Sequence, residues 1–249
     1  MEGVGLEKVI GEAGVLSPEE FREAVLLVEP RVAVFDCDGT LWSGDAGSAF
    51  MRWSIETGLA SREMADWIGG RYEGYLRGEV SEAAICGEMV QMYSGLRDEE
   101  MRRAAAVFVE AHVRRGIFPE MLELTREFGA RGAEVWAVSS TNDWVIEEGV
   151  REFGIGPERV LAARVEVTGG RVTGRLLGVP TDEAKVTALA GAGVGRPDVV
   201  FGNSGHDAAM LGIARRAFAV NPTAALRERS AAEGWAVFLP ELRRSGAGG

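Results

Sequence analysis

Residues 32–40, which read VAVFDCDGT, decide the fold of this chain. The short apolar run VAVF is typical of a strand that is buried on both faces of a parallel sheet. The run ends at Asp36 and Asp38, with Gly39 directly after them. In open α/β sheets, ligands bind beyond the carboxyl ends of the strands. The two acidic residues therefore mark a candidate functional site at the tip of this strand.

The rest of the chain repeats this alternation of strand and helix. Two extended runs flank Gly169 and Gly170, which is the signal of a two-residue hairpin. Further strands are predicted at 134–139, 199–202, 217–220 and 235–238, and helices at 119–131, 143–153, 182–191, 206–215 and 223–233. Strands that alternate with helices predict an α/β fold with a doubly wound, mainly parallel sheet and right-handed crossovers.

Residues 46–115 have a different character, because their apolar residues recur at helical spacing with almost no strand signal. We interpret this stretch as an α-helical cap domain inserted into an α/β core formed by residues 31–45 and 116–249. In residues 1–30, the sequence from Ser17 to Glu20 reads as a capping box with proline at the first helical position. We expect this N-terminal helical segment to pack on the core.

Composition excludes several classes of protein. The 249 residues are 46% hydrophobic and 26% charged, which is typical of a globular protein, and they include only two cysteines. The net charge of −11 argues against binding to nucleic acid or to anionic membranes, both of which need basic residues. No stretch resembles a signal peptide or a membrane span, so we expect a cytoplasmic protein. An anionic substrate would need a local cation.

Other polar residues follow the later strands or begin the helix after the hairpin. They are Ser139, Ser140, Lys185, Asn203, His206 and Asp207. Because the carboxyl ends of parallel strands meet at one edge of the sheet, we expect these residues to gather around the two acidic residues of the first motif.

The order of these motifs resembles the haloacid dehalogenase superfamily. A DxDGT motif is followed by a hydrophobic strand ending in Ser, then by Lys, and then by a GxSxxD segment. The helical insertion directly after the first motif is similar to the phosphoserine phosphatase-like branch. The resemblance covers about residues 31–240 and implies a Rossmann-like core. It further implies a Mg²⁺-dependent phosphatase that hydrolyses a small phosphate monoester, a phosphorylated metabolite, through an aspartyl-phosphate intermediate.

The resemblance assigns three catalytic residues. Asp36 is the expected nucleophile, and Asp38 is the expected general acid for the leaving alcohol and then base for water. Lys185 is expected to balance the negative charge of the phosphoryl group. An acid at position 38 favours phosphate-ester chemistry over dehalogenation, although phosphotransferases and phosphomutases share that acid.

The phosphoryl group and the metal are expected to bind to neighbouring but different sets of residues. Gly39 allows the bend that brings amide groups toward the phosphate, and the hydroxyls of Ser139 and Ser140 lie on the next strand tip. The resemblance places Mg²⁺ on Asp36, Asp38, Asn203 and Asp207, with the backbone carbonyl of Asp38 as its ligand.

One departure from the family pattern concerns the metal. The family usually has Asp where this chain has Asn203, so one negative charge is missing and metal affinity should fall. We expect Asp207 to take a larger share as a direct ligand. The alternative is a catalytically weak or inactive protein that binds a phosphorylated ligand.

Two further residues are candidates for substrate selection. Asp45 stands where phosphoserine phosphatases have the acid that receives the substrate's amino group, although a helix N-cap is an equally good interpretation. His206 adjoins Asp207 at the rim of the site. The cap segment 78–96 contains no arginine to receive a carboxylate, so we expect phosphoserine to be a poor substrate. An uncharged or amine-bearing phosphate monoester is expected instead.

Overall fold

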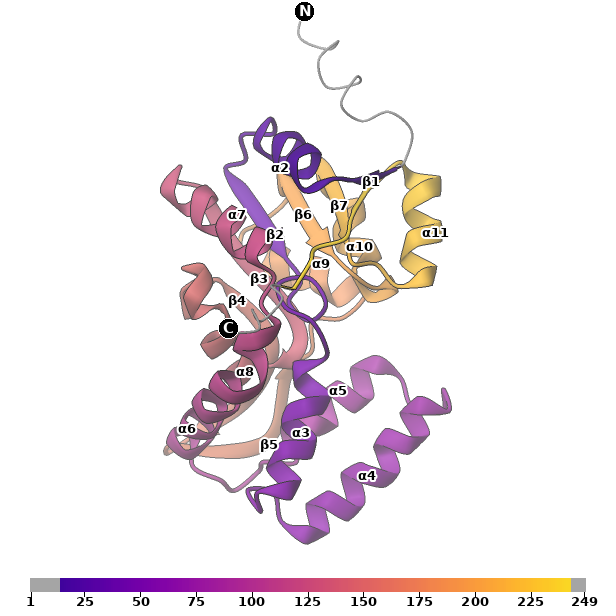
Figure 1. Ribbon diagram of the computed structural model, residues 1–249. Helices are drawn as coiled ribbons and strands as arrows, with labels where there is room; N and C mark the ends of the chain where they lie inside the picture. The colour runs from indigo at the N-terminus through magenta and orange to yellow at the C-terminus, as the bar shows by residue number, and fades with distance from the viewer. Residues whose placement is uncertain (1–13, 243–249) are drawn as a thin grey trace, which may run out of the picture.

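The computed structural model describes residues 14–242 and contains a central eight-stranded sheet (Figure 1). Its strand order is β1-β8-β7-β6-β2-β3-β4-β5, and every neighbouring pair is parallel except β4 and β5. The strands are β1 (Val15–Leu16), β2 (Val32–Phe35), β3 (Glu134–Asn142), β4 (Val160–Thr168), β5 (Arg171–Gly178), β6 (Val199–Gly202), β7 (Arg216–Val220) and β8 (Ala236–Phe238). The predicted α/β class and mainly parallel sheet are confirmed.

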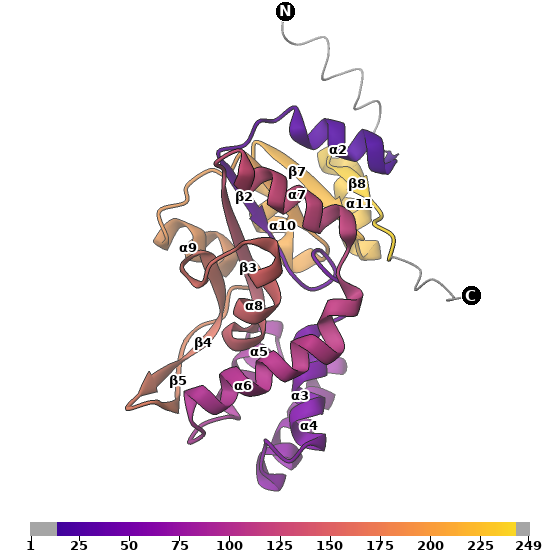
Figure 2. The same ribbon diagram turned by 60° about the vertical axis from the view of Figure 1, so that its left-hand side comes forward.

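Helices cover both faces of this sheet, as side chains of β2 show. Ala33 and Phe35 join one apolar cluster with α2 (Pro18–Leu26), α7 (Pro119–Ala130) and α8 (Asp143–Gly149). Figure 2 shows α7 and α8 on that face. Val34 joins a second cluster with α9 (Glu183–Gly191), α10 (Ala208–Gly212) and α11 (Ala224–Glu233). The continuous apolar run of β2 therefore reflects burial on both sides, as predicted for a doubly wound fold.

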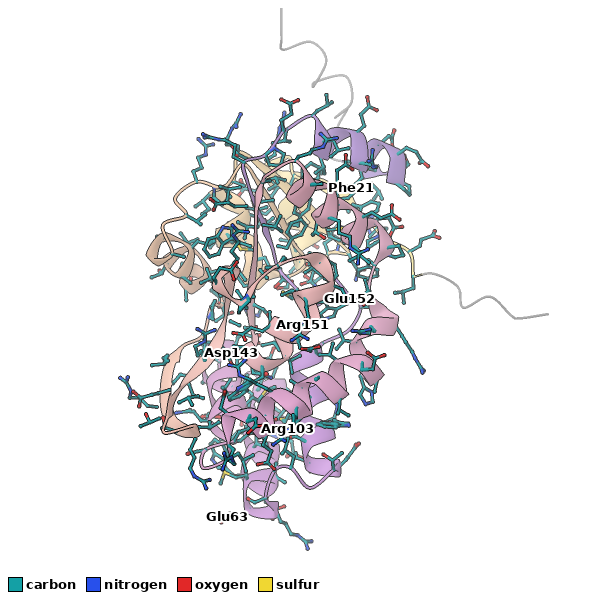
Figure 3. The ribbon with its side chains drawn as sticks, turned by 90° about the vertical axis from the view of Figure 1, so that its left-hand side faces the viewer. Phe21, Glu63, Arg103, Asp143, Arg151 and Glu152 are labelled. Carbon is teal, nitrogen blue, oxygen red and sulfur yellow. The ribbon has the colours of Figure 1, made fainter. Side chains whose placement is uncertain are left out.

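The start of the described chain braces one edge of the sheet. The predicted capping box is present, because Glu20 N–H donates to Ser17 Oγ at 3.2 Å while Ser17 N–H donates to Glu20 Oε2 at 2.8 Å. Phe21 of α2, labelled in Figure 3, stacks on Phe238 with ring centroids 4.0 Å apart. Strand β1 was not predicted, since two residues are too short for a pattern. The parts of the sequence predictions over 1–13 and 243–249 lie outside the described residues.

The segment predicted as a cap contains four helices in succession. They are α3 (Ala46–Glu56), α4 (Arg62–Leu76), α5 (Glu82–Gln91) and α6 (Asp98–Phe108). They lie beyond the end of the sheet at which β2 stops (Figure 1). The two connections to the core lie side by side, with Ser43 N–H donating to the carbonyl of Gly116 at 2.8 Å. Within residues 14–242, no helix is long and apolar enough to span a bilayer.

The β4–β5 hairpin extends from the core to the inserted helices. Its turn is made by Gly169 and Gly170, whose φ angles of +59° and +73° fit the predicted two-residue turn. The carbonyl of Val172 accepts a hydrogen bond from Gly95 N–H after α5, and Leu176 packs against Gly87 within α5. The hairpin thus packs against α5 and the residues that follow it, a contact that the sequence did not predict.

Asp198 fixes the beginning of the central strands. Its carboxylate accepts hydrogen bonds from the N–H groups of Arg31 and Val32 at 2.9 and 3.1 Å, and from Arg215 at 2.7 Å. Burial alone would raise the pKa of Asp198, but these donors outweigh it and hold the pKa below its ordinary value. The charged carboxylate therefore stabilises the fold.

We expect Asp198→Asn to lower the free energy of unfolding by about 1–3 kcal/mol at pH 7, because charged hydrogen bonds are lost. With a depressed folded-state pKa, the stabilisation is complete above the ordinary value of about 3.9 and is lost as the pH falls through the folded-state value. Urea unfolding of both proteins between pH 7 and pH 3 measures this. A difference that stays constant over that range would contradict it.

Candidate active site

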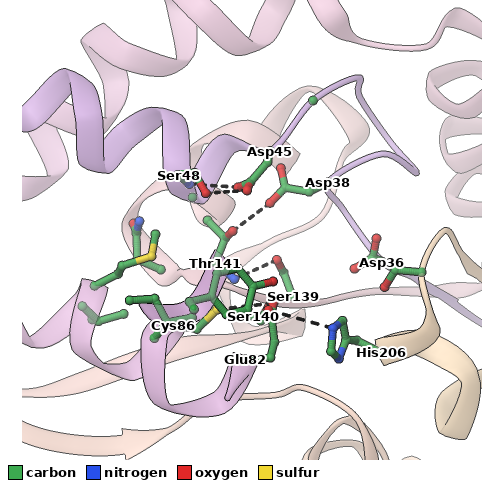
Figure 4. A pocket seen from close by; sticks show the side chains of 18 of the residues that line it. Asp36, Asp38, Asp45, Ser48, Glu82, Cys86, Ser139, Ser140, Thr141 and His206 are labelled. Atoms are coloured by element: carbon green, nitrogen blue, oxygen red, sulfur yellow. Dashed lines mark hydrogen bonds and ion pairs between the residues drawn. The ribbon is translucent and has the colours of Figure 1, made fainter. Parts of the chain in front are cut away.

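The candidate active site is a cavity of about 360 Å³ between the carboxyl ends of the strands and helices α3 to α5 (Figure 4). The core side of its wall includes Asp36, Ser139, Lys185 and Asn203. The helical insertion contributes Tyr72, Tyr75, Glu82 and Met89. The structure thus brings together residues from β3, from the loops after β2 and β6 and from the start of α9, as the position of the motifs predicted.

Lys185 is the central cation of this site. It lies in the first turn of α9 and is buried, with its ammonium 2.8 Å from Asp36 Oδ1 and 2.5 Å from Asp207 Oδ1. The carbonyl of Val138, in the middle of β3, accepts a third hydrogen bond at 3.1 Å. Burial alone would lower the pKa of Lys185, but the charges of Asp207 and Asp36 outweigh it and raise the pKa above its ordinary value. The side chain therefore stays charged.

Asp36 lies at the tip of β2 with both carboxylate oxygens hydrogen-bonded. Oδ1 accepts from Lys185, and Oδ2 accepts from the hydroxyl of Thr40 at 3.0 Å. Burial and the nearby charge of Asp207 raise the pKa of Asp36 above its ordinary value, and Lys185 opposes that shift. The carboxylate is fixed in position, which is what an attacking group requires.

Asp38 points toward Thr141 and the start of the helical insertion (Figure 4). Its Oδ1 accepts hydrogen bonds from Trp42 Nε1 at 2.7 Å and from Ala46 N–H at 2.8 Å, and its Oδ2 accepts from Thr141 Oγ1 at 2.7 Å. Burial, followed by the negative charge of Asp45, raises the pKa of Asp38 to about 6, while the three donors oppose the shift. A carboxyl group of this kind can give and take a proton near neutral pH.

Gly39 permits a close approach between the first and last motifs. Its φ angle is +77°, and a Cβ at this position would lie 1.9 Å from Nδ2 of Asn203. The amide of Asn203 therefore packs directly against the loop that carries Asp36 and Asp38. The N–H of Gly39 donates to the carbonyl of Trp42 at 2.8 Å, so this particular amide is engaged in the turn.

Asp207 anchors the loop after β6. Its Oδ2 accepts hydrogen bonds from the N–H groups of Asn203 and Ser204, both at 2.9 Å, while its Oδ1 is held by Lys185. The prediction of Asp207 as a direct metal ligand is therefore revised, because donors already surround this carboxylate. In the described part of the chain, no three acidic, histidine or cysteine side chains are grouped so that they alone could hold a metal ion.

Ser139 and Ser140 both line the cavity but differ in what they contact. The hydroxyl of Ser139 is buried and accepts a hydrogen bond from Thr141 N–H at 3.1 Å. The hydroxyl of Ser140 faces the helical insertion and donates to Glu82 Oε1 at 3.4 Å. The contacts of Ser139 therefore suit its predicted role of donating to a phosphoryl oxygen. Those of Ser140 do not, because its hydroxyl donates to the carboxylate of Glu82.

Asp45 and His206 are the predicted substrate-selecting residues, and both lie at the cavity. Asp45 is the N-cap of α3, with its oxygens accepting from Ser48 N–H at 2.8 Å and Ser48 Oγ at 2.5 Å. His206 Nδ1 is 2.9 Å from Asp182 Oδ1, and its Nε2 is 3.9 Å from Glu82 Oε2. His206 therefore reaches from the core toward the insertion.

The family model of haloacid dehalogenase-like hydrolases matches residues 33–212, which is more than half of the chain. The chain belongs to this family. The resemblance predicted from the motifs is confirmed, and this haloacid dehalogenase-like hydrolase carries its first and last motifs within the matched range.

Several known proteins are similar to this hydrolase. Histidinol-phosphatase of Neisseria meningitidis serogroup C (strain 8013) is 25% identical over 84% of this chain and 98% of its own length. Protein CicA of Caulobacter vibrioides (strain NA1000 / CB15N) is 27% identical over 75% of this chain and 84% of its own length. The crystal structure of a protein with unknown function from Bordetella pertussis Tohama I has a TM-score of 0.73 at 27% identity, covering 84% of this chain and 97% of that chain.

Phosphoserine phosphatase shares the fold. Its substrate-bound complex has a TM-score of 0.56 at 17% identity, covering 85% of this chain and 93% of that chain. This likeness agrees with the predicted phosphoserine phosphatase-like arrangement of core and helical insertion.

Several residues of the hydrolase's site were missed by sequence reasoning. Trp42 and Thr141 hold Asp38, and Glu82 reaches across the cavity from α5. Thr141 follows Ser139 and Ser140 directly, and this run of hydroxyl residues was the available signal. Glu82 occupies the first position of a helix, where an acid is common for reasons of capping alone, so the sequence held no signal for its direction.

We expect Lys185→Met to destabilise the hydrolase by about 3–5 kcal/mol at pH 7, because Asp36 and Asp207 would remain buried without their cation. Urea unfolding with matched m-values measures the change. The double variant Lys185→Met with Asp36→Asn removes one unpaired charge and should recover part of the loss. A single variant as stable as the wild type would show that the two carboxylates do not depend on Lys185.

Proposed function

We propose that the protein is a Mg²⁺-dependent phosphatase that hydrolyses a small phosphate monoester through an aspartyl-phosphate intermediate. The observation that carries this proposal is the pair Asp36 and Lys185, a fixed carboxylate and its ammonium on the floor of a cavity. Asp38 stands two residues on, with a pKa near 6. A nucleophile, a cation and a proton donor are the groups that this reaction needs.

In the first step, a carboxylate oxygen of Asp36 attacks phosphorus, and the bond between phosphorus and the ester oxygen breaks. The leaving alcohol takes its proton from Asp38. Lys185 offsets the negative charge that gathers around the phosphoryl oxygens, and the Ser139 hydroxyl donates to one of them. This is how a protein of net charge −11 accommodates an anionic substrate.

In the second step, water attacks the phosphorus of the aspartyl-phosphate and loses its proton to Asp38. The bond between phosphorus and the Asp36 oxygen breaks, so that inorganic phosphate leaves and the carboxylate is regenerated. Thr141 and Trp42 keep Asp38 in one orientation throughout, because they donate to different oxygens of its carboxylate. We regard both as positioning residues.

The available oxygen ligands fit Mg²⁺, which prefers carboxylates, carbonyls and water. Asp36, the backbone carbonyl of Asp38 and the side-chain amide of Asn203 would hold it, since Asn203 packs against the loop of the first motif. When bound, the ion would neutralise charge between the nucleophile and the phosphoryl group. Asp207 would not contact the ion directly but would hold the backbone of its ligand Asn203 in place.

The relatives support phosphatase chemistry. The similar protein from Neisseria meningitidis is named a histidinol-phosphatase and matches along nearly its whole length. A phosphoserine phosphatase shares the fold. Segment 78–96 carries no arginine, and the described cavity wall contains none either, so we propose that phosphoserine itself is a poor substrate.

One observation favours a second candidate. With Asn203 in place of a carboxylate, the metal ligands supply less negative charge, which suits a weakly active protein that binds a phosphorylated ligand. The phosphatase is preferred because the nucleophile, the general acid and the lysine are all present and oriented.

We expect Asp36→Asn to reduce release of inorganic phosphate from p-nitrophenyl phosphate to background at every Mg²⁺ or Mn²⁺ concentration, because the amide is not a nucleophile. The matched control is Asp66→Asn, an exposed residue of α4 that does not line the cavity. Wild-type activity in the Asp36 variant would remove it as nucleophile. A wild-type protein inactive with every ester and metal would instead support the ligand-binding alternative.

We expect Asn203→Asp to lower the Mg²⁺ concentration needed for half-maximal activity by roughly tenfold, because a carboxylate adds charge to the ligands. Without Mg²⁺ the added charge lies beside other acids, so the variant should unfold more easily than the wild type. Asn203→Ala should shift the Mg²⁺ requirement in the opposite direction. Metal titrations of activity and of thermal unfolding test this, and identical curves for all three proteins would exclude Asn203 as a ligand.

A further inference from the structure

We infer that the alcohol part of the substrate carries a positively charged ammonium group and that Glu82 recognises it. The inference rests on the proposed phosphatase function and narrows its substrate class. It starts from the part of the cavity that lies between Lys185 and the inserted helices, where the group esterified to phosphate must lie (Figure 4).

The charges of the described cavity wall favour a cation in this region. Among the described residues of the cavity wall, four are acids, Asp36, Asp38, Asp45 and Glu82, and the basic ones are Lys185 and His206. The positive charge of Lys185 is already balanced by its ion pairs with Asp36 and Asp207. A second anionic group on the substrate would therefore be repelled and left without a partner, while an ammonium group would be attracted.

Among the acids, Glu82 is the one suited to contact the substrate. Asp45 is held by two short hydrogen bonds from Ser48, at 2.8 and 2.5 Å. The contacts of Glu82 are longer: 3.4 Å to Ser140 Oγ, 3.5 Å to Cys86 Sγ and 3.9 Å to His206 Nε2. Such contacts are weak, and an ammonium group can displace them. This differs from the prediction that Asp45 receives an amino group.

Aromatic side chains complete this half of the cavity. Tyr72 and Tyr75 line it with ring centroids 5.9 Å apart, and burial, followed by the nearby Glu82, raises the pKa of Tyr75 above its ordinary value. Tyr72 donates its hydroxyl hydrogen to Ser48 Oγ at 3.1 Å, which fixes its ring. An ammonium group beside tyrosine faces and one carboxylate is stabilised by both cation–π and ionic interactions. A neutral alcohol gains neither of these.

The substrate class is therefore the phosphate ester of a small amino alcohol or quaternary ammonium alcohol without a carboxylate. The cavity of about 360 Å³ limits its size. The phosphoryl group would lie at Lys185, and the ammonium group would lie between Glu82 and the two tyrosines.

Pairs of esters that match in shape and differ in charge test this. Phosphocholine is compared with 3,3-dimethylbutyl phosphate, and phosphoethanolamine with propyl phosphate, under saturating Mg²⁺. We expect kcat/KM to favour the charged member by about tenfold or more in at least one pair, as expected for a desolvated cation on aromatic rings and a carboxylate. The phosphoserine rate should fall below that of phosphoethanolamine.

Two matched variants assign the preference to one residue. Glu82→Gln keeps the shape of the side chain and should reduce the charged-to-neutral ratio of kcat/KM toward one, chiefly through KM of the charged ester. Glu63→Gln makes the same change at an exposed position of α4 that does not line the cavity, at the far end of the helical insertion in Figure 3, and should keep the ratio.

The outcomes separate the two proposals. Turnover of p-nitrophenyl phosphate with equal rates for the members of each pair would overturn the ammonium class while leaving the phosphatase in place. A charge preference that survives Glu82→Gln unchanged would overturn the role of Glu82. Failure of every ester, p-nitrophenyl phosphate included, would overturn the phosphatase and this inference with it.

Discussion

The structure depends on one buried ammonium group. Lys185 joins the tip of β2 through Asp36, the loop after β6 through Asp207 and the middle of β3 through a backbone carbonyl. Three segments far apart in the sequence thus converge on a single charge in a place that excludes water. A buried cation without carboxylates, or the carboxylates without the cation, would cost several kcal/mol. The ion pairs of Lys185 that hold these three segments together also orient the proposed nucleophile. The same residues therefore serve both stability and the proposed chemistry.

The sheet and most helices could be predicted because their causes are local. The apolar run before Asp36, the capping box at Ser17 and the turn at Gly169 and Gly170 each encode their conformation within a few residues. The residues of the first motif were found for the same reason, since they directly follow a buried strand. Strand β1 escaped because it exists only through pairing with β8.

What could not be predicted is how side chains from distant segments meet. Thr141 binds Asp38 from 103 residues away, and Ser140 meets Glu82 across 58 residues. Nothing in the spacing of these residues specifies such contacts, which arise only when β3 pairs with β2 and α5 packs against β3. The negative charge of the whole chain was equally ambiguous until the cavity wall was known. The structure then showed that four of the acids line the cavity between the core and the inserted helices.

The adjoining connections at Ser43 and Gly116 have a consequence for how such proteins diversify. Because the inserted segment leaves and re-enters the core at neighbouring points, the sheet is continuous without it. The helices can be exchanged as a cassette, provided that the replacement still rests on the β4–β5 hairpin. Under the proposed function, most groups that act on the phosphate would lie on the core and the groups that select the alcohol on the insertion, so that the two could change largely independently.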